Sequence, residues 1–240
     1  MTFDPFGDFE TQGYLRNLAK EKDSAVLRPL EFLSVVSGID AALERLTKVE
    51  NLSYPDVLET HRLLFEFIYP WAGQDRLIVA PDLAVAKGPI LFARPRDIRR
   101  AVEFALRHGQ DPTVMAAKPG EIMGYLAYGH PFLDGNWRTM MPVYGVLAQR
   151  AGFGINWGAM VRADYESALM QELDDPGKGR LDRYLARFTR DAVADDQLSN
   201  EFVQSLYPDG DDDEDAVLGK ITDPAVQARY EQQDLRRRRD

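Results

Sequence analysis

The sequence predicts a mainly helical protein with a single β-hairpin. The first observation is that apolar residues from Leu27 to about Val49 recur at the spacing of a helix. The second is a pair of short β-prone runs, Arg76–Ala80 and Pro89–Ala93, with proline, aspartate and glycine between them. Turn-forming residues between two such runs predict a hairpin with a long tip. The third is that the other periodic segments up to residue 193 all have helical spacing.

Each further helix is predicted from its start signal and its apolar spacing. Ser53 is a candidate N-cap, Pro55 lies in the first turn, and the helix carries apolar residues as far as Ile68. Four more segments are predicted to be helical: from Asp97 to about Arg107, from Pro119 to Tyr128, 159–172 and 179–193. A non-helical turn at His130–Gly135 is expected to precede one more helix, which ends near Arg150.

Composition limits the class of protein. The chain has 240 residues, 45% of them hydrophobic, which suffices for one sizeable core and an extension. The formal net charge of −10 argues against a general nucleic-acid binder. No run of about 18 apolar residues is present, so no membrane partner is expected. There is no secretory signal and no cysteine. We therefore expect a cytoplasmic protein.

Two divisions of the chain are expected. Residues 1–193 are predicted to form the domain, with residues 1–25 as an N-terminal arm. Residues 194–240 are predicted to be an acidic C-terminal extension, partly helical or flexible, because they contain the acidic run 209–215 and the basic cluster 236–239. A surface extension is the simpler interpretation, and a docking segment or an intramolecular regulator is the alternative.

The segment from His130 to Arg138, HPFLDGNWR, concentrates the chemistry. A helix that starts after Gly135 presents unpaired N–H groups and a positive dipole end, which suit a phosphate. Asn136 offers an amide donor, and Arg138 offers a planar donor fork. Asp134 is an oxygen ligand suited to Mg²⁺, and His130 can take a proton near neutral pH. Together they predict a site for phosphoryl or nucleotidyl transfer.

This segment resembles the active-site motif of the Fic (Fido) family, His-x-Phe-x-Asp/Glu-Gly-Asn-Gly-Arg-x-x-Arg. Other stretches, in the same order as in that family, extend the resemblance over roughly residues 4–190. These are Asp4–Glu10 with Gly13–Asn17, Tyr69–Gln74 followed by Arg76, Lys87–Phe92, and Ile155–Trp157. The resemblance implies the Fic fold of bacterial proteins, a bundle of about eight helices with one β-hairpin flap. It also implies AMPylation, the transfer of AMP from Mg²⁺-bound ATP to a Ser, Thr or Tyr hydroxyl of a protein.

The resemblance also implies a role for each matched residue. His130 would be the general base, Asp134 would hold Mg²⁺, and Arg138 would bind the phosphates of the nucleotide donor. The anion hole would be formed by Gly135, Asn136 and the backbone that follows. A target protein would dock on the flap as an added strand, along the residues Lys87, Gly88, Ile90 and Phe92.

Two motif positions depart from the family. Trp137 stands where the family has its second glycine, and Met141 stands where it has its last arginine. Met141 cannot bind a γ-phosphate. One outcome is an altered use of the donor: a pocket without that arginine suits a diphosphate-linked nucleotide, or ATP bound in another orientation. The other is a catalytically impaired protein that serves as a nucleotide-binding or protein-binding module. The orientation of the Trp137 ring matters for both outcomes: a ring that points into the site fills space that a triphosphate needs, whereas a ring that points away leaves that space open.

Several nearby residues have simpler interpretations. His61 is expected to be structural on its helix, and His108 to be exposed near a helix end. The Arg94–Arg100 cluster is expected to be a solvated helix start, with phosphate or target contact as the alternative. A Ser/Thr-x-x-x-Glu-Gly/Asn pattern, which holds some Fic proteins inactive, does not occur in the sequence.

Overall fold

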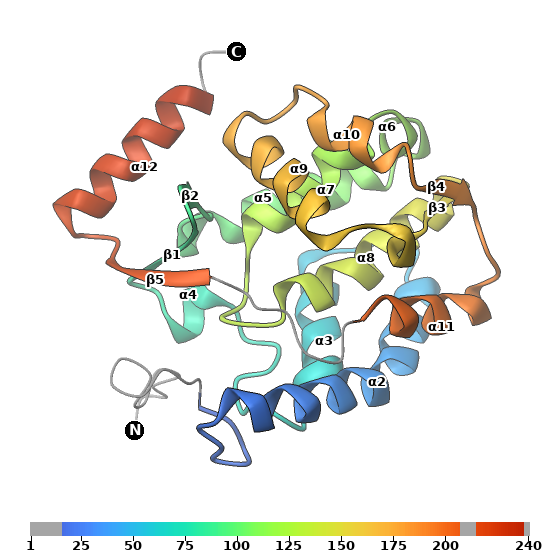
Figure 1. Ribbon diagram of the computed structural model, residues 1–240, viewed down its shortest axis with the longest axis horizontal. Coiled ribbons are helices and arrows are strands. Elements are labelled where there is room, and N and C mark those ends of the chain that lie inside the picture. Colours follow the sequence, from blue (N-terminus) through green and yellow to red (C-terminus); the bar gives the residue numbers. More distant parts are fainter. Residues whose placement is uncertain (1–15, 207–214, 238–240) are drawn as a thin grey trace.

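The computed structural model describes residues 16–206 and 215–237, and within them the protein is mainly helical, as predicted (Figure 1). Residues 1–15 of the predicted N-terminal arm, and residues 209–214 of the acidic run, lie outside the described residues. The longer helices are α2 (Ser24–Lys48), α3 (Tyr54–Phe65), α5 (Ile98–Gly109), α7 (Pro119–Gly129), α8 (Asn136–Arg150), α9 (Arg162–Asp174), α11 (Asp195–Ser205) and α12 (Pro224–Arg237). Three are short: α4 (Arg76–Val79), α6 (Pro112–Ala117) and α10 (Arg180–Leu185). No helix of the described chain is both long enough and apolar enough to span a bilayer.

Helix α8 runs through the main core and is buried along most of its length. Helices α2, α3 and α7 pack around it, and α5 packs on α7. Leu198 and Phe202 of α11 belong to the same core. The first helix after the predicted boundary at residue 193 therefore packs on the domain itself, and the boundary stays a prediction.

Helices α2 and α3 approach each other closely because a glycine lies at their contact. The Ser34 hydroxyl donates a hydrogen bond of 2.7 Å to the Leu64 carbonyl of α3. One turn further along α2, a Cβ on Gly38 would overlap the carbonyl oxygen of Leu63. The start of α3 is fixed locally, because the Asp56 carboxylate accepts from the backbone N–H of Ser53 at 2.9 Å, as expected for a capping residue.

The predicted hairpin exists, but its first strand was misplaced. Residues 76–79 form the short helix α4, because the side chain of Asp75 accepts from the Ile78 N–H. The hairpin pairs β1 (Leu83–Lys87) with β2 (Ile90–Leu91). Its tip is therefore short, with Gly88 at a φ of 54° that favours glycine. The sequence misled because Leu-Ile-Val is β-prone in isolation, whereas the Asp75 cap starts a helix.

Strands that the sequence did not predict complete two small sheets. Strand β5 (Asp215–Lys220) pairs with β1, so the first sheet has the order β2-β1-β5, and Figure 1 shows β5 and α12 beside the hairpin. Strands β3 (Phe153–Ile155) and β4 (Thr189–Asp191) form the second sheet. The helix predicted over 179–193 was therefore wrong beyond Leu185, because residues 189–191 pair with a distant strand.

The close contact at Gly38 gives a stability test with a matched control. We expect Gly38→Ala to lower the free energy of unfolding by about 1–3 kcal/mol, because the added methyl forces α2 away from α3. Gly145 lies inside α8 with open space around its Cβ position. There alanine should stabilise the protein by up to about 1 kcal/mol through helix propensity alone. Urea unfolding of both variants checks the pair, and equal effects would contradict the close packing.

Candidate functional site

The turn between α7 and α8 is held by a buried arginine. Helix α7 ends at Gly129, and His130 adopts a φ of 42° and a ψ of 60°, a left-handed conformation that is unfavourable for a residue with a side chain. Arg76, fully buried, donates from Nε to the His130 carbonyl at 2.7 Å and from Nη2 to the Ala93 carbonyl at 2.9 Å. Its backbone N–H donates to the Pro131 carbonyl at 2.7 Å. One residue thus fixes the turn and ties it to the flap.

The imidazole of His130 is fixed on two sides. Its ring stacks on Phe92 of the flap with the centroids 3.8 Å apart. The Asn136 side-chain oxygen accepts from the Phe132 N–H at 2.9 Å, which sets the orientation of that amide. Its Nδ2 therefore faces His130 Nε2, at 3.0 Å, and donates to it. This places the imidazole lone pair on Nε2, the form that accepts a proton.

The N-terminus of α8 opens directly after the turn. Gly135 has a φ of 73°, and a Cβ there would lie 2.5 Å from the Phe65 ring, so both backbone conformation and space require glycine. Helix α8 begins at Asn136, and the N–H groups of its first turn point out of the helix end, where an anion is favoured. The structure thus puts Gly135 and Asn136 at the start of α8, and their role in binding an anion stays a prediction.

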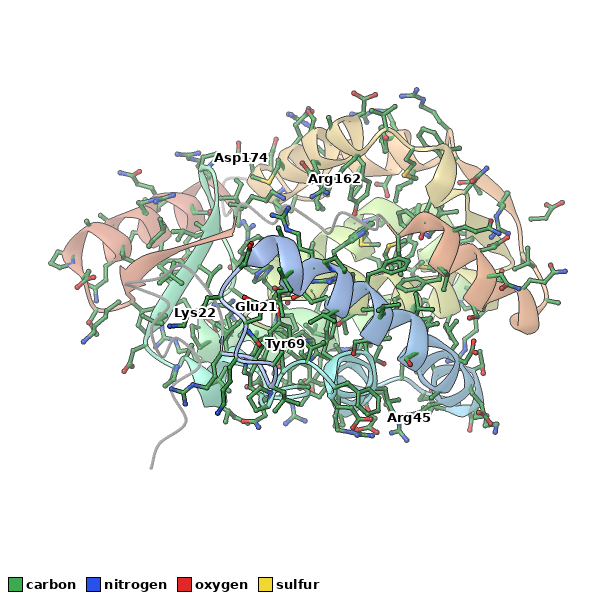
Figure 2. The ribbon with its side chains drawn as sticks, turned by 60° about the horizontal axis from the view of Figure 1, so that its bottom comes forward. Glu21, Lys22, Arg45, Tyr69, Arg162 and Asp174 are labelled. Carbon is green, nitrogen blue, oxygen red and sulfur yellow. The ribbon has the colours of Figure 1, made fainter. Side chains whose placement is uncertain are left out.

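Arg138 and Asp134 lie in a charged network with two residues that the sequence analysis did not single out. Arg138 donates to Asp134 Oδ1 at 3.0 Å and to Glu31 Oε2 of α2 at 3.2 Å. The single hydroxyl proton of Tyr69 is shared between Glu31 and Asp134 Oδ2, the latter at 3.2 Å. Figure 2 shows Tyr69 in the interior near α2. No motif signalled Glu31, because a carboxylate 107 residues from Arg138 reaches it only through the packing of α2 on α8.

Burial perturbs the acid of this network. Glu31 is only 5% exposed, and burial together with the nearby Asp134 charge raises the pKa of its carboxyl to about 7, against the lowering effect of Arg138 and Tyr69. Above neutral pH, Arg138 is therefore held by two carboxylates, and at lower pH by one.

His61 supports the same turn from α3. Its ring stacks on Phe132 with centroids 3.8 Å apart, and its Nε2 donates to the Asp134 carbonyl at 3.1 Å. Nδ1 accepts from the Gly73 N–H at 2.9 Å. Complete burial lowers the pKa of His61 to about 3, so the ring is neutral and structural, as expected. The other outlying histidine, His108, is half-buried rather than exposed, and its Nδ1 bonds the carbonyl of Phe104 in its own helix.

A cavity of about 110 Å³ lies beside His130. Four other predicted site residues also line it: Lys87, Phe92, Asn136 and Trp137. The remaining lining is largely apolar and includes Met140, Met141, Met160, Trp157 and Tyr165. Asp134 and Arg138 are not among the described residues that line the cavity. Gly88 lies at the flap tip, and Ile90 is buried in the flap and also lies outside this lining.

The Trp137 ring faces this apolar wall. It meets the Trp157 ring edge-on with centroids 5.4 Å apart, and the Tyr165 ring lies 4.8 Å away. Met141 is buried beside it, 2% exposed. Both departures from the motif therefore make the same cavity more apolar. Among the described lining residues, Lys87 and Arg162 are cationic, and both pair with the carboxylate of Glu166.

Asp134 suits magnesium as a single ligand. Its side chain is 24% exposed. Oδ1 already accepts from Arg138 and from the Gly135 N–H, whereas Oδ2 accepts from Tyr69 and keeps acceptor capacity. In the described part of the chain, no three His, Asp or Glu residues lie close enough together to hold an ion. Because Mg²⁺ in nucleotide sites commonly takes one or two carboxylates and completes its shell with phosphate oxygens and water, the residues fit an ion that arrives with a nucleotide.

The arginine cluster divides in two. Arg96, Arg99 and Arg100 are exposed and pair with carboxylates of their own segment, as expected for a solvated helix start. Arg94 instead pairs with Asp234 of α12 at 3.0 Å.

The raised pKa of Glu31 predicts a pH dependence of stability. Between about pH 4.5 and 7 the unfolded chain has lost the Glu31 proton while the folded protein retains it, so the free energy of unfolding falls as the pH rises through this window. Glu31→Gln should remove this part of the pH dependence. Urea unfolding from pH 4.5 to 8 measures it, with exposed Glu50→Gln as the control. An unchanged slope in Glu31→Gln would show that Glu31 does not titrate in this range.

The chain was compared with known proteins. Residues 51–146 match the Fic/DOC family model. Protein adenylyltransferase VbhT of Bartonella schoenbuchensis is 29% identical over 199 residues, which are 78% of this chain and 40% of VbhT. The chain thus spans less than half the length of that relative. The y4lH protein of Sinorhizobium fredii, named a probable protein adenylyltransferase, is 27% identical over 151 residues, covering 59% of this chain and 74% of y4lH.

Solved structures share the fold. BepC from Bartonella tribocorum, with bound AMPPNP, aligns with a TM-score of 0.62 at 17% identity, over 77% of this chain and 96% of that chain. The N-terminal Fic domain of a Bep effector from Bartonella quintana, with bound ADP, gives a TM-score of 0.62 at 20% identity, over 77% and 94% of the two chains. The family match covers the His130–Arg138 segment, and the fold around it is that of Fic domains. The chain therefore contains a Fic (Fido) domain, which the family model matches over residues 51–146.

Proposed function

We propose that this protein transfers a nucleotidyl or related phospho group from a nucleotide donor to a Ser, Thr or Tyr hydroxyl of a protein, with His130 as general base. The observation that supports this best is the fixed imidazole. Its Nε2 is held in the proton-accepting form by Asn136, beside both the cavity and the N-terminus of α8. The relatives named as adenylyltransferases make AMP the first group to test.

The proposed step is a displacement at phosphorus. The hydroxyl proton of the acceptor passes to His130 Nε2, and the acceptor oxygen forms a bond to the α-phosphorus of the donor. The bond from that phosphorus to the bridging oxygen breaks, and for ATP the electron pair leaves with pyrophosphate. The N–H groups at the start of α8 would stabilise the charge that develops on the phosphoryl oxygens. Mg²⁺, held by Asp134, would supply charge neutralisation to the donor phosphates.

Before a donor can bind Arg138, the resting ion pairs must rearrange. Arg138 is 7% exposed and is already held by Glu31 and Asp134. Likewise, Asn136 occupies His130 Nε2, where the acceptor hydroxyl would have to come. Such a closed resting arrangement also favours a second candidate, a Fic-fold module that binds a nucleotide or a protein without turnover.

The apolar wall of the cavity bears on the choice of donor. Trp137 and Met141 offer rings and methylenes where the family motif has glycine and arginine, and a γ-phosphate would gain no charge-assisted bond from position 141. A donor with a diphosphate link and a far end without phosphate suits this wall better than a triphosphate. We therefore propose that ATP is a weaker donor for this protein than a diphosphate-linked nucleotide.

The base assignment predicts the effect of removing His130. His130→Ala should lower the rate of transfer at least about 100-fold, because the acceptor hydroxyl then loses its proton acceptor. The assay is mass spectrometry of cell lysate proteins incubated with the chain, Mg²⁺ and one donor at a time (ATP, GTP, UTP, CTP, CDP-choline and UDP-sugars). His108→Ala is the matched control, since that ring bonds only the Phe104 carbonyl in the described contacts. Transfer that persists in His130→Ala would reject the assignment, and absence of any transfer in wild type would favour the binding module.

The two motif departures predict a change of donor. We expect Trp137→Gly/Met141→Arg to increase the use of ATP relative to CDP-choline or a UDP-sugar, because the γ-phosphate regains a charged partner. Since Met141 is buried, thermal unfolding should first show that the double variant folds. Trp137→Ala tests the ring alone if it does not. A donor ranking that is unchanged in the folded variants would mean that the apolar wall does not select the donor.

A further inference from the structure

The flap is a hairpin with two main-chain edges, and the C-terminal segment (residues 215–237, comprising β5 and α12) occupies both. On the outer edge of β1, strand β5 is antiparallel, with Ala86 opposite Ala216 and Leu83 opposite Lys220. The pairing continues past the strand, where the Ile221 N–H donates to the Asp82 carbonyl at 2.7 Å. No further strand can add to β1 while β5 is in place.

On the outer edge of β2, a side chain takes the place of a strand. Gln233 of α12 accepts from the Leu91 N–H at 2.9 Å and donates to the Leu91 carbonyl at 2.7 Å. A neighbouring antiparallel strand would make the same pair of bonds with Leu91. The next outward-facing residue, Ala93, is also satisfied, because its N–H donates to the Tyr128 carbonyl and its carbonyl accepts from Arg76. The edge of β2 that borders His130 is thus filled by the chain itself.

The contacts that hold α12 there are mainly those of single polar side chains. Arg229 donates to the Gly88 carbonyl at 3.3 Å, and Arg237 donates to the Leu173 carbonyl of α9 at 2.7 Å. The Tyr230 hydroxyl donates to the Phe92 carbonyl at 3.2 Å, and the Arg94 guanidinium lies 4.1 Å from the Tyr230 ring centre. Arg94 pairs with Asp234, and two residues further along α12 Arg236 pairs with Asp174 of α9, which is labelled in Figure 2. Both pairs are partly exposed, so each contributes little to stability.

Apolar burial adds only a small cluster. Ala84, Ala86 and Leu91 of the flap are buried against Val226 and Tyr230 of α12, and this cluster is separate from the main core. Leu218 and Ile221 pack against its rim, and the cluster as a whole is much smaller than the main core. The C-terminal segment is therefore attached to the flap by contacts that another extended chain could replace.

We propose that the C-terminal segment is an intramolecular competitor of the protein acceptor: it fills the flap edges to which an extended segment of the acceptor would add as a strand. This rests on the proposed function, in which the flap receives the acceptor. Gln233 stands in for the acceptor backbone at Leu91. Release of the segment is then required for modification of a protein.

The same geometry limits what the segment controls. None of the described cavity-lining residues belongs to β5 or α12. Binding of the donor should therefore not depend on the segment, whereas docking of the acceptor should. If the segment were only a structural part of the fold, it would cover the flap edges, but releasing it would not change the rate of transfer to a protein.

The first test opens one contact and locks another. Gln233→Ala removes both bonds to Leu91, and its neighbour Gln232, which is exposed, gives the matched control Gln232→Ala. Leu83→Cys/Lys220→Cys places a disulfide across the β1–β5 pair in a chain that has no cysteine of its own.

We expect labelling of lysate proteins by the active donor to rise roughly tenfold in Gln233→Ala, the effect of losing two hydrogen bonds, and to stay unchanged in Gln232→Ala. It should stop in the oxidised double-cysteine chain and return with dithiothreitol.

The second test needs no enzymatic activity, so it separates failure of this proposal from failure of the proposed function. The probe is a fluorescent synthetic peptide with the sequence of residues 215–237. It should bind the full chain carrying Ala216→Pro, in which proline breaks the ladder of the resident strand, and should not bind the oxidised double-cysteine chain. Binding of ADP should be the same in all forms. Equal labelling by the locked and released forms of an active chain, or equal peptide binding by the proline and locked chains, would overturn the proposal.

Discussion

The buried guanidinium of Arg76 is the contact on which the rest of the site depends. It joins the carbonyl of His130 to that of Ala93, and so connects the left-handed turn to the end of the flap. A buried charge is costly unless it is hydrogen-bonded, and these two carbonyls accept bonds from Arg76. The His130 carbonyl points at the guanidinium in the observed conformation of the turn. The strain of a left-handed histidine is thereby balanced, and the imidazole is placed against Phe92 rather than in solvent.

A second layer of interactions keeps the site in a resting form. Asn136 is bonded to the Phe132 backbone and donates to His130, and Arg138 is bonded to Glu31 and Asp134. These bonds make the proposed base and the proposed phosphate ligand well ordered in the absence of substrate. They must also be broken before catalysis, because the donor and the acceptor have to replace hydrogen bonds that Arg138 and His130 already make. Glu31 adds a dependence on pH, because its carboxyl titrates near neutrality.

The flap and the cavity are controlled by different parts of the chain. The cavity is walled by residues of the flap, α7, α8, α9, α11 and the segment between β3 and α9, and the Trp137 ring makes it apolar. The flap edges are covered by β5 and α12. Selection of the donor and admission of the acceptor can thus change independently. The C-terminal extension, which composition alone marks only as acidic and polar, becomes the structural neighbour of the proposed docking surface.

The sequence by itself determined the helices around the site and the chemistry of the turn. Periodicity and caps are local, so α2, α3, α7 and α8 were predicted close to their observed bounds, and the spacing of His130, Asp134 and Asn136 is fixed within one turn and one helix start. Only the tertiary structure decided the direction of Trp137, the pairing of Glu31 with Arg138, and the addition of β5 to β1. Each of these joins segments far apart in the chain. Such contacts depend on how helices and strands pack in space, and a pattern read along one segment contains no information about its distant partner.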